Sequence, residues 1–338
     1  MIEILLNSEE PAVRLKAAVD VLGQDPYGLV TMLQREQMKA SPRVQRLLSE
    51  RDADGRIPYH PYSKWRGAHW VLVCLAELGY PSGDESLLPL RDQVFGWLLG
   101  KDHERHIETV NGRVRRCASQ EGNALYAALV LGLADSRVEE LVQRLISWQW
   151  PDGGWNCDRR PEAAKSSFME TLIPARGLAW HGKFTGSGES IKASRRAAGV
   201  FLRRNLFRRQ SDGSVIEEDF TRLHHPCYWH YDILFALKVL AEAGFIVDRR
   251  CDEALDLLES KRLADDGWPA EGKYYHVARQ GKDGPTPARH ISSGSSLVDW
   301  GPTGKRRMNE FVTADALYVL KAAGRLPQPV ELPPSYEG

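Results

Sequence analysis

Three cysteines of this chain lie just before stretches whose composition predicts a helix: Cys117, Cys157 and Cys227. His230 follows Cys227 by three residues. Thiolate sulfur and imidazole nitrogen are ligands that zinc prefers. If the loops before these helices meet at one end of the fold, Cys117, Cys157, Cys227 and His230 form a candidate zinc site. The alternative is that the cysteines fill apolar space and the histidine is packed, because no Cys-x-x-Cys or His-x-x-x-His pair fixes the ligands locally.

A second set of polar residues lies at the starts of the same predicted helices, and three of them could transfer protons. They are Glu170, His230 and Asp232. A histidine near a carboxylate in an aromatic-walled cavity can act as a general acid or base. Helix capping and the helix dipole explain Glu170 and Asp232 equally well without a catalytic role. The aromatic residues predicted to line such a cavity are Tyr228, Trp229 and Tyr231.

Basic residues gather in the segment 269–310, which is longer than a plain connection between helices. Arg289, Lys305 and Arg306 are candidates for binding a diphosphate or carboxylate headgroup. Solvated surface charge is the alternative. We expect this segment to form a lid or one edge of a pocket.

An Asp-Gly turn recurs along the chain, and its fullest copy, which lies between tryptophans, spans 148–155. A predicted helix ends there, and Asp152-Gly153-Gly154 then supplies a tight turn before Trp155. Recurrence at similar intervals indicates a structural repeat. The recurring Asp-Gly pairs are Asp54-Gly55, Asp152-Gly153, Asp212-Gly213 and Asp266-Gly267.

Gln149 followed by Gly153-x-Trp155 resembles the Gln-Trp repeat of squalene-hopene cyclases and their relatives. Those proteins share a toroid of paired helices with the β subunits of protein prenyltransferases. The match is partial, because Arg144 stands where that repeat has an aromatic residue and Leu206 stands where a further copy would have its glutamine. The resemblance covers about residues 42–324 as architecture. It implies an all-α fold, an α/α toroid of about six inner and six outer helices.

The resemblance also implies two kinds of activity. Class II cyclases protonate an alkene or epoxide through an Asp-x-Asp-Asp motif, which this sequence lacks; Leu263-Ala264 precedes Asp265-Asp266. Prenyltransferase β subunits hold zinc with an aspartate, a cysteine and a histidine, and bind a prenyl diphosphate. We therefore expect an enzyme acting on an isoprenoid or similar elongated apolar substrate in the barrel cavity, with no cofactor required or with zinc. A zinc-dependent prenyltransferase-like enzyme and a non-catalytic lipid-binding or protein-interaction scaffold are the alternatives.

The predicted helices alternate in composition. One set carries charge on one face and is expected outside; the other is apolar nearly all round and is expected inside. The chain is expected to divide into an N-terminal helical pair at 1–41 that closes or caps the ring, the toroid at 42–326 and a Pro-rich tail at 327–338. The expected outer helices are 42–50, 86–100, 137–149, 190–206 and 249–262, and the inner ones 66–79, 122–134, 167–180, 228–243 and 311–323.

Composition bounds the remaining function classes. Lys+Arg and Asp+Glu are both 45 in 338 residues, so no global field favours nucleic acid. The first ten residues are too short and acidic for a signal peptide, and no apolar run approaches the roughly 20 residues of a membrane span. Five cysteines, an odd number, indicate reduced thiols and a cytoplasmic protein. Peripheral membrane contact, as in squalene cyclases, and a partner subunit stay open.

Overall fold

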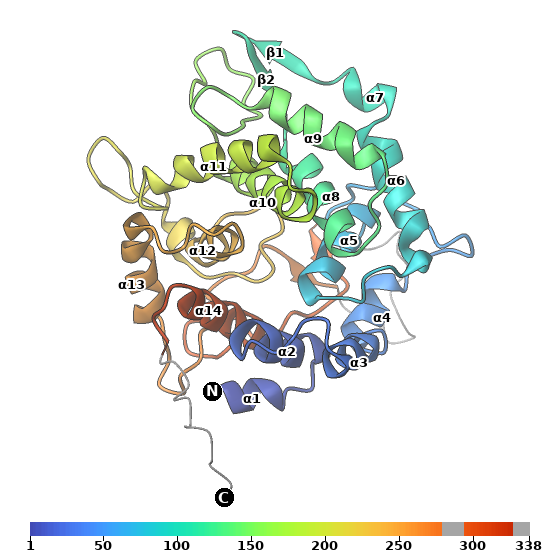
Figure 1. Ribbon diagram of the computed structural model, residues 1–338, viewed down its shortest axis with the longest axis vertical. Helices are drawn as coiled ribbons and strands as arrows, with labels where there is room; N and C mark the ends of the chain where they lie inside the picture. The colour runs from blue at the N-terminus through green and yellow to red at the C-terminus, as the bar shows by residue number, and fades with distance from the viewer. Residues whose placement is uncertain (279–293, 327–338) are drawn as a thin grey trace, which may run out of the picture.

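The computed structural model describes residues 1–278 and 294–326, and most of this part of the chain is helical (Figure 1). The all-α fold class is confirmed. Strands occur only as short pairs, β1 (Glu108–Val110) with β2 (Arg113–Arg115) and β3 (His276–Val277) with β4 (Ser295–Ser296), among the described residues. The α-helices are α1 (Ile2–Leu6), α2 (Pro11–Lys16), α3 (Leu29–Met38), α4 (Pro42–Leu48), α5 (Ala68–Leu78), α6 (Leu88–Leu98), α7 (Lys101–Glu104), α8 (Ser119–Val130), α9 (Arg137–Trp148), α10 (Phe168–Thr185), α11 (Gly188–Leu202), α12 (Ile233–Glu242), α13 (Asp252–Ser260) and α14 (Glu310–Ala322).

The helices that the sequence predicts to be buried contact one another in chain order. Helix α5 packs on α8, α8 on α10, α10 on α12, α12 on α14, and α14 on α2 near the N-terminus. Figure 1 places α9, α11 and α13 outside α8, α10 and α12. Almost every residue of α5 is buried, whereas α9 buries only the stripe Val138, Leu141, Val142 and Leu145. This difference follows the predicted alternation of composition.

Two of the inner helices, α8 and α10, approach each other closely because glycine occupies the contact on both. A Cβ added to Gly122 would lie 2.6 Å from the backbone nitrogen of Pro174, and one added to Gly177 would lie 2.7 Å from the carbonyl oxygen of Gly122. Any larger side chain there would force the helices apart. The close approach fixes the spacing between the N-terminal ends of α8 and α10.

The turn at 150–155 is built by three hydrogen bonds. The backbone N–H of Trp150 donates to the carbonyl of Gly154 (2.8 Å). The indole N–H of Trp155 returns to the carbonyl of Leu145 on α9 (2.9 Å), and its backbone N–H donates to the hydroxyl of Thr171 on α10 (3.1 Å). The tryptophan therefore ties an outer helix to the following inner helix.

The same three bonds recur at the next glycine-tryptophan turn. The backbone N–H of Leu263 donates to the carbonyl of Gly267 (2.8 Å). The indole N–H of Trp268 donates to Leu258 on α13 (2.8 Å), and its backbone N–H to the hydroxyl of Thr313 on α14 (2.9 Å). Both copies connect an outer helix to an inner one, so the repeat of turns predicted from the sequence is present here as repeated geometry.

Buried ion pairs link the inner helices where they face one another. Lys238 of α12 lies 2.9 Å from Glu77 of α5 and 3.1 Å from Asp315 of α14. Asp315 is also 2.8 Å from Lys16 of α2. Although burial opposes it, the charges of Lys16 and Lys238 lower the pKa of Asp315 to about 2. Asp315 is therefore ionised at neutral pH.

The ion pairs continue to α10 and α8 through Arg176. Its guanidinium pairs with Glu77, forms two bonds of 2.6 and 2.7 Å to Glu242 of α12, and donates to the hydroxyl of Tyr126 on α8 (2.9 Å). We call Lys16, Glu77, Arg176, Lys238, Glu242 and Asp315 the central ionic network. Each cation in it has a carboxylate partner, which is the condition under which buried charge is tolerated.

The remaining expectations on domain organisation fall partly outside the described residues. The tail at 327–338 and Arg289 lie outside them. The described flanks of the segment 269–310 pair with each other through a bridge from Ala270 to Thr303, and one of them pairs with the loop before α12 through a bridge from Gly272 to His224. Among the described helices, none is long and apolar enough to span a bilayer.

Candidate functional site

Cys117 and Cys157 are brought together by the loops that precede α8 and α10. Arg115, in the strand just before Cys117, forms a parallel bridge with Asn156, and the backbone N–H of Arg116 donates to the Asn156 carbonyl (3.2 Å). Each cysteine follows its bridge by one or two residues, so the two thiols face each other. Both side chains are half-buried.

Glu170 completes this group from the first turn of α10. Its Oε2 accepts the backbone N–H of Ser119, the first residue of α8 (3.0 Å), and its Oε1 lies 3.8 Å from the sulfur of Cys157. The two sulfurs and a carboxylate oxygen all lie within 4.8 Å of one another. The sequence predicts a proton-transfer role for Glu170 and a metal-binding role for Cys117 and Cys157. In the structure the three residues lie together.

The electrostatics of the group favour one thiolate over the other. Burial raises the pKa of the Glu170 carboxyl. A hydrogen bond from the Cys117 thiol lowers the pKa of Cys157, and the same bond raises the pKa of Cys117. Cys157 is therefore the thiol that ionises first, with Cys117 as its donor.

Cys227 lies in a different cluster, in the segment before α12. Asp232 caps that helix by accepting the backbone N–H of Phe235 (2.8 Å), and it also accepts the backbone N–H of His224 (2.8 Å). The Cys227 sulfur lies 3.3 Å from the same carboxylate. Burial and the Asp232 charge raise the pKa of the Cys227 thiol. The Asp232 carboxylate thus holds the segment before α12 in place, and the protonated Cys227 thiol donates to this carboxylate.

His230 lies before α12, since the helix begins at Ile233 rather than at 228 as expected. Its Nδ1 donates to the carbonyl of Cys227 (3.1 Å). Burial lowers the pKa of the imidazole to about 4, so the ring is neutral at pH 7. Its Nε2 has no hydrogen-bond partner among residues 1–278 and 294–326. Among the same residues, the group of metal-ligand atoms within 4.8 Å includes neither Cys227 nor His230.

A band of aromatic rings runs across the loops that precede α5 and α12. Trp97 of α6 stacks on Tyr62 with ring centroids 5.5 Å apart, and Tyr62 lies 6.5 Å from Trp229. Trp229 stacks on His230 (4.2 Å), and His230 stacks on Tyr274 with planes only 4° apart (3.6 Å). All five are half-buried. We call these residues the aromatic band.

Other residues expected to bind substrate lie elsewhere. Tyr231 is fully buried, packs among Phe168, Phe201 and Phe220, and donates its hydroxyl to the carbonyl of Leu206 (2.6 Å). Tyr228 is buried against Trp70. Of the three predicted aromatic residues, only Trp229 belongs to the band. Lys305 and Arg306 are exposed.

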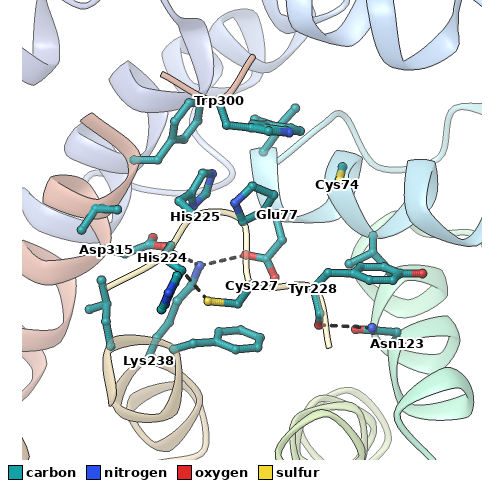
Figure 2. Close-up of a pocket in the computed structure, with 17 residues that line it drawn as sticks. Cys74, Glu77, Asn123, His224, His225, Cys227, Tyr228, Lys238, Trp300 and Asp315 are labelled. Carbon is teal, nitrogen blue, oxygen red and sulfur yellow. Dashed lines mark hydrogen bonds and ion pairs between the residues drawn. The ribbon is translucent and has the colours of Figure 1, made fainter. Parts of the chain in front are cut away.

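The segment 224–228 lines a pocket of about 40 Å³, together with Glu77, Lys238 and Asp315 of the central ionic network (Figure 2). Figure 2 shows His225, Glu77, Lys238 and Asp315 around it, with Trp300 above. Small-molecule sites are typically about 300–1,000 Å³, and one water needs at least about 10–15 Å³. This pocket accommodates a few waters. An isoprenoid does not fit this pocket in this conformation.

Tyr62, Trp97 and Tyr274 are the site residues that sequence reasoning missed. They come from the loop before α5, from α6 and from the loop after α13, which are far apart in the chain. Each is a single aromatic residue without a motif. The local clue for Tyr62 is the aromatic and basic run from Tyr59 to Trp65 before an apolar helix.

No protein-family model matches the sequence, and a comparison with curated proteins finds no match. Solved structures similar to this chain include Dfg5 from Chaetomium thermophilum in complex with glucosamine, at 14% identity and a TM-score of 0.42 over 92% of this chain and 79% of that one. A glycosidase is 14% identical at a TM-score of 0.34 over 85% and 99%. A type II terpene cyclase, MstE from Scytonema, is 16% identical at 0.28 over 88% and 100%. At these values the similarities assign no function.

Proposed function

We propose that this protein is an α/α toroid enzyme of the terpenoid cyclase and prenyltransferase type that binds an elongated apolar substrate, such as an isoprenoid, across the aromatic band. The order of contacts among the inner helices supports the toroid. The observation that carries the binding proposal is the unbroken run of half-buried rings from Trp97 to Tyr274. Such rings offer large apolar faces at little cost in side-chain entropy.

The position of the band supports a substrate held where the loops before α5 and α12 meet, which we call the mouth, rather than in the interior. Between the inner helices lie buried ion pairs, and the pocket beside them has a volume of only about 40 Å³. At the mouth, Lys64 lies over the Trp229 ring with its ammonium 4.7 Å from the centroid. A cation at one side of an apolar surface matches an elongated substrate with a polar or anionic end.

His230 is the residue proposed to accept a proton from such a substrate. Its neutral imidazole lies in the middle of the band, and its Nε2 is unprotonated because Nδ1 donates to the Cys227 carbonyl. A substrate stacked on Trp229 and Tyr274 would place its reactive carbon or hydroxyl next to this nitrogen. Asp232, by contrast, is assigned no proton transfer, because its carboxylate accepts the backbone N–H groups of His224 and Phe235 and so positions the loop before α12.

The proposal is tested by titrating the protein with geranylgeraniol and with geranylgeranyl diphosphate while following tryptophan fluorescence. Removing one ring should weaken binding about tenfold or more, from about 25 cal/mol per Å² of lost apolar contact. Trp229→Ala and Tyr274→Ala are the test variants, and Phe184→Ala, which removes an exposed ring on α10, is the matched control. Equal affinities in all three variants would refute binding at the band.

Turnover separates an enzyme from a non-catalytic lipid-binding protein. Products are followed by mass spectrometry after incubation with the ligand that binds. His230→Ala should abolish turnover and leave the circular dichroism spectrum unchanged. A fully active His230→Ala protein would remove the histidine from the mechanism without affecting the binding result.

A further inference from the structure

Two thiols and a carboxylate converge where the loops before α8 and α10 meet. The sulfurs of Cys117 and Cys157 and an oxygen of Glu170 lie within 4.8 Å of one another. They come from three separate stretches of chain, so no local turn forces them together. From this geometry we infer that Cys117, Cys157 and Glu170 form a binding site for a thiophilic divalent cation, with zinc the best match.

The spacing is close to that of a tetrahedral zinc site. Zinc binds sulfur at about 2.3 Å and carboxylate oxygen at about 2.0–2.2 Å, which puts two sulfurs about 3.8 Å apart and a sulfur and an oxygen about 3.5 Å apart. The sulfur of Cys157 already lies 3.8 Å from Oε1 of Glu170. The remaining pairs, at no more than 4.8 Å, need shifts of at most about 1.3 Å.

The second oxygen of Glu170 is held in place from outside the group. Oε2 accepts the backbone N–H of Ser119 at the start of α8 (3.0 Å), which leaves Oε1 facing the sulfurs. Outer hydrogen bonds of this kind orient the ligand atoms of metal sites. The Gly122 and Pro174 contact between α8 and α10 holds the Ser119 and Glu170 ends at this separation.

The charge balance also suits a divalent cation. Two thiolates and a carboxylate carry three negative charges, which zinc would reduce to one. The neighbouring guanidinium of Arg116 is already paired with the buried Glu121 carboxylate (3.0 Å). The N-terminal end of α8 adds a partial positive charge at Ser119.

Sulfur ligands decide which cation fits. Calcium and magnesium require oxygen ligands and are disfavoured by two thiolates, whereas zinc accepts a mixed sulfur and oxygen set. Three protein ligands leave one coordination position open, as in catalytic rather than structural zinc sites.

The test measures metal directly and does not depend on any activity. The full chain is purified without a tag under reducing, oxygen-free conditions, and its zinc content is determined before and after loading with zinc and removing the excess. About one zinc per chain is expected. Replacing zinc by cobalt should give the intense near-ultraviolet absorption of thiolate-to-cobalt charge transfer.

Cysteine variants locate the site. Cys117→Ser with Cys157→Ser should lose the stoichiometric metal and the charge-transfer absorption, and Glu170→Gln should weaken zinc binding by about tenfold or more. Cys227→Ser and Cys74→Ser, which remove buried thiols elsewhere, are matched controls that should keep both signals. If the double variant does not fold by circular dichroism, each single serine variant should show reduced cobalt absorption.

Three results would overturn the inference. Reduced wild-type protein that takes up no stoichiometric zinc or cobalt would do so, as would metal that persists unchanged in the Cys117 and Cys157 variants. A disulfide between these cysteines that survives reduction, detected as two missing thiols, would also replace the metal site. None of these outcomes affects ligand binding at the band, so the two proposals fail separately.

Discussion

Replacing Lys238 by methionine should destabilise the protein strongly, because it leaves a buried carboxylate uncompensated. Lys238 lies 2.9 Å from Glu77 and 3.1 Å from Asp315, and its side chain is only 8% exposed. Methionine keeps an unbranched apolar side chain, one heavy atom shorter than lysine, and removes the ammonium group with its charge. The central ionic network then carries one more negative than positive charge. Breaking a buried pair in this way costs about 3–5 kcal/mol.

The charge-balanced double variant distinguishes this cause from lost packing. Glu77→Gln combined with Lys238→Met leaves Arg176 paired with Glu242 and Lys16 paired with Asp315. Each remaining charge keeps a partner, so the double variant should recover much of the free energy of unfolding that the single variant loses. The control is Arg105→Ala, whose ion pair with Asp102 is almost fully exposed and should matter by less than about 0.5 kcal/mol.

The assay is urea unfolding followed by tryptophan fluorescence and circular dichroism together, which also tests whether the transition has two states. A loss of about 4 kcal/mol would move the midpoint by on the order of 1 M urea. A Lys238→Met protein with the wild-type midpoint would refute the reasoning. So would a double variant less stable than the single one, because the loss would then come from packing.

Two further predictions follow from single buried groups. His69 is 1% exposed, and burial lowers its pKa to about 4. As the pH falls, the unfolded chain, with a histidine pKa near 6.5, binds this proton before the folded chain does. The free energy of unfolding should therefore fall by about 3 kcal/mol between about pH 6.5 and about pH 4, and His69→Gln should remove that part of the slope in pH-dependent denaturation. Gln149 donates to the carbonyls of Gly153 (2.7 Å) and Ala193 (2.8 Å), so Gln149→Ala should cost about 1–3 kcal/mol in thermal unfolding while Ser147→Ala does not.

Much of the fold could be predicted because the amino-acid composition of a helix indicates how deeply it is buried. Stretches that are apolar all round became α5, α8, α12 and α14, and the two Asp-Gly turns followed by tryptophan became equivalent hydrogen-bonded turns. The start of α12 was placed five residues early. Apolar and aromatic residues run on into the preceding loop, and only the Asp232 side chain, which accepts the Phe235 N–H, marks the true beginning.

The site was predicted less well, because its groups depend on pairing between distant loops. Cys117, Cys157 and Glu170 all stand out in the sequence, but only the bridge between Arg115 and Asn156 shows that they share one place. Spacing along the chain instead favoured Cys227 with His230. The central ionic network was missed because single charges such as Lys238, in an otherwise apolar helix, give no sign of a partner on another helix.

The central ionic network has a consequence for how the repeats depend on one another. In an open solenoid each repeat contacts only its neighbours, so one end can unfold while the other persists. Here Glu77 of α5 pairs with Lys238 of α12, although α8 and α10 lie between them in the order of contacts. Loss of α5, for example, removes the Glu77 carboxylate from Lys238 of α12 and from Arg176 of α10, neither of which follows α5 directly in the order of contacts. The network therefore makes unfolding cooperative across the whole set of inner helices, and shortened versions with fewer helix pairs should not fold.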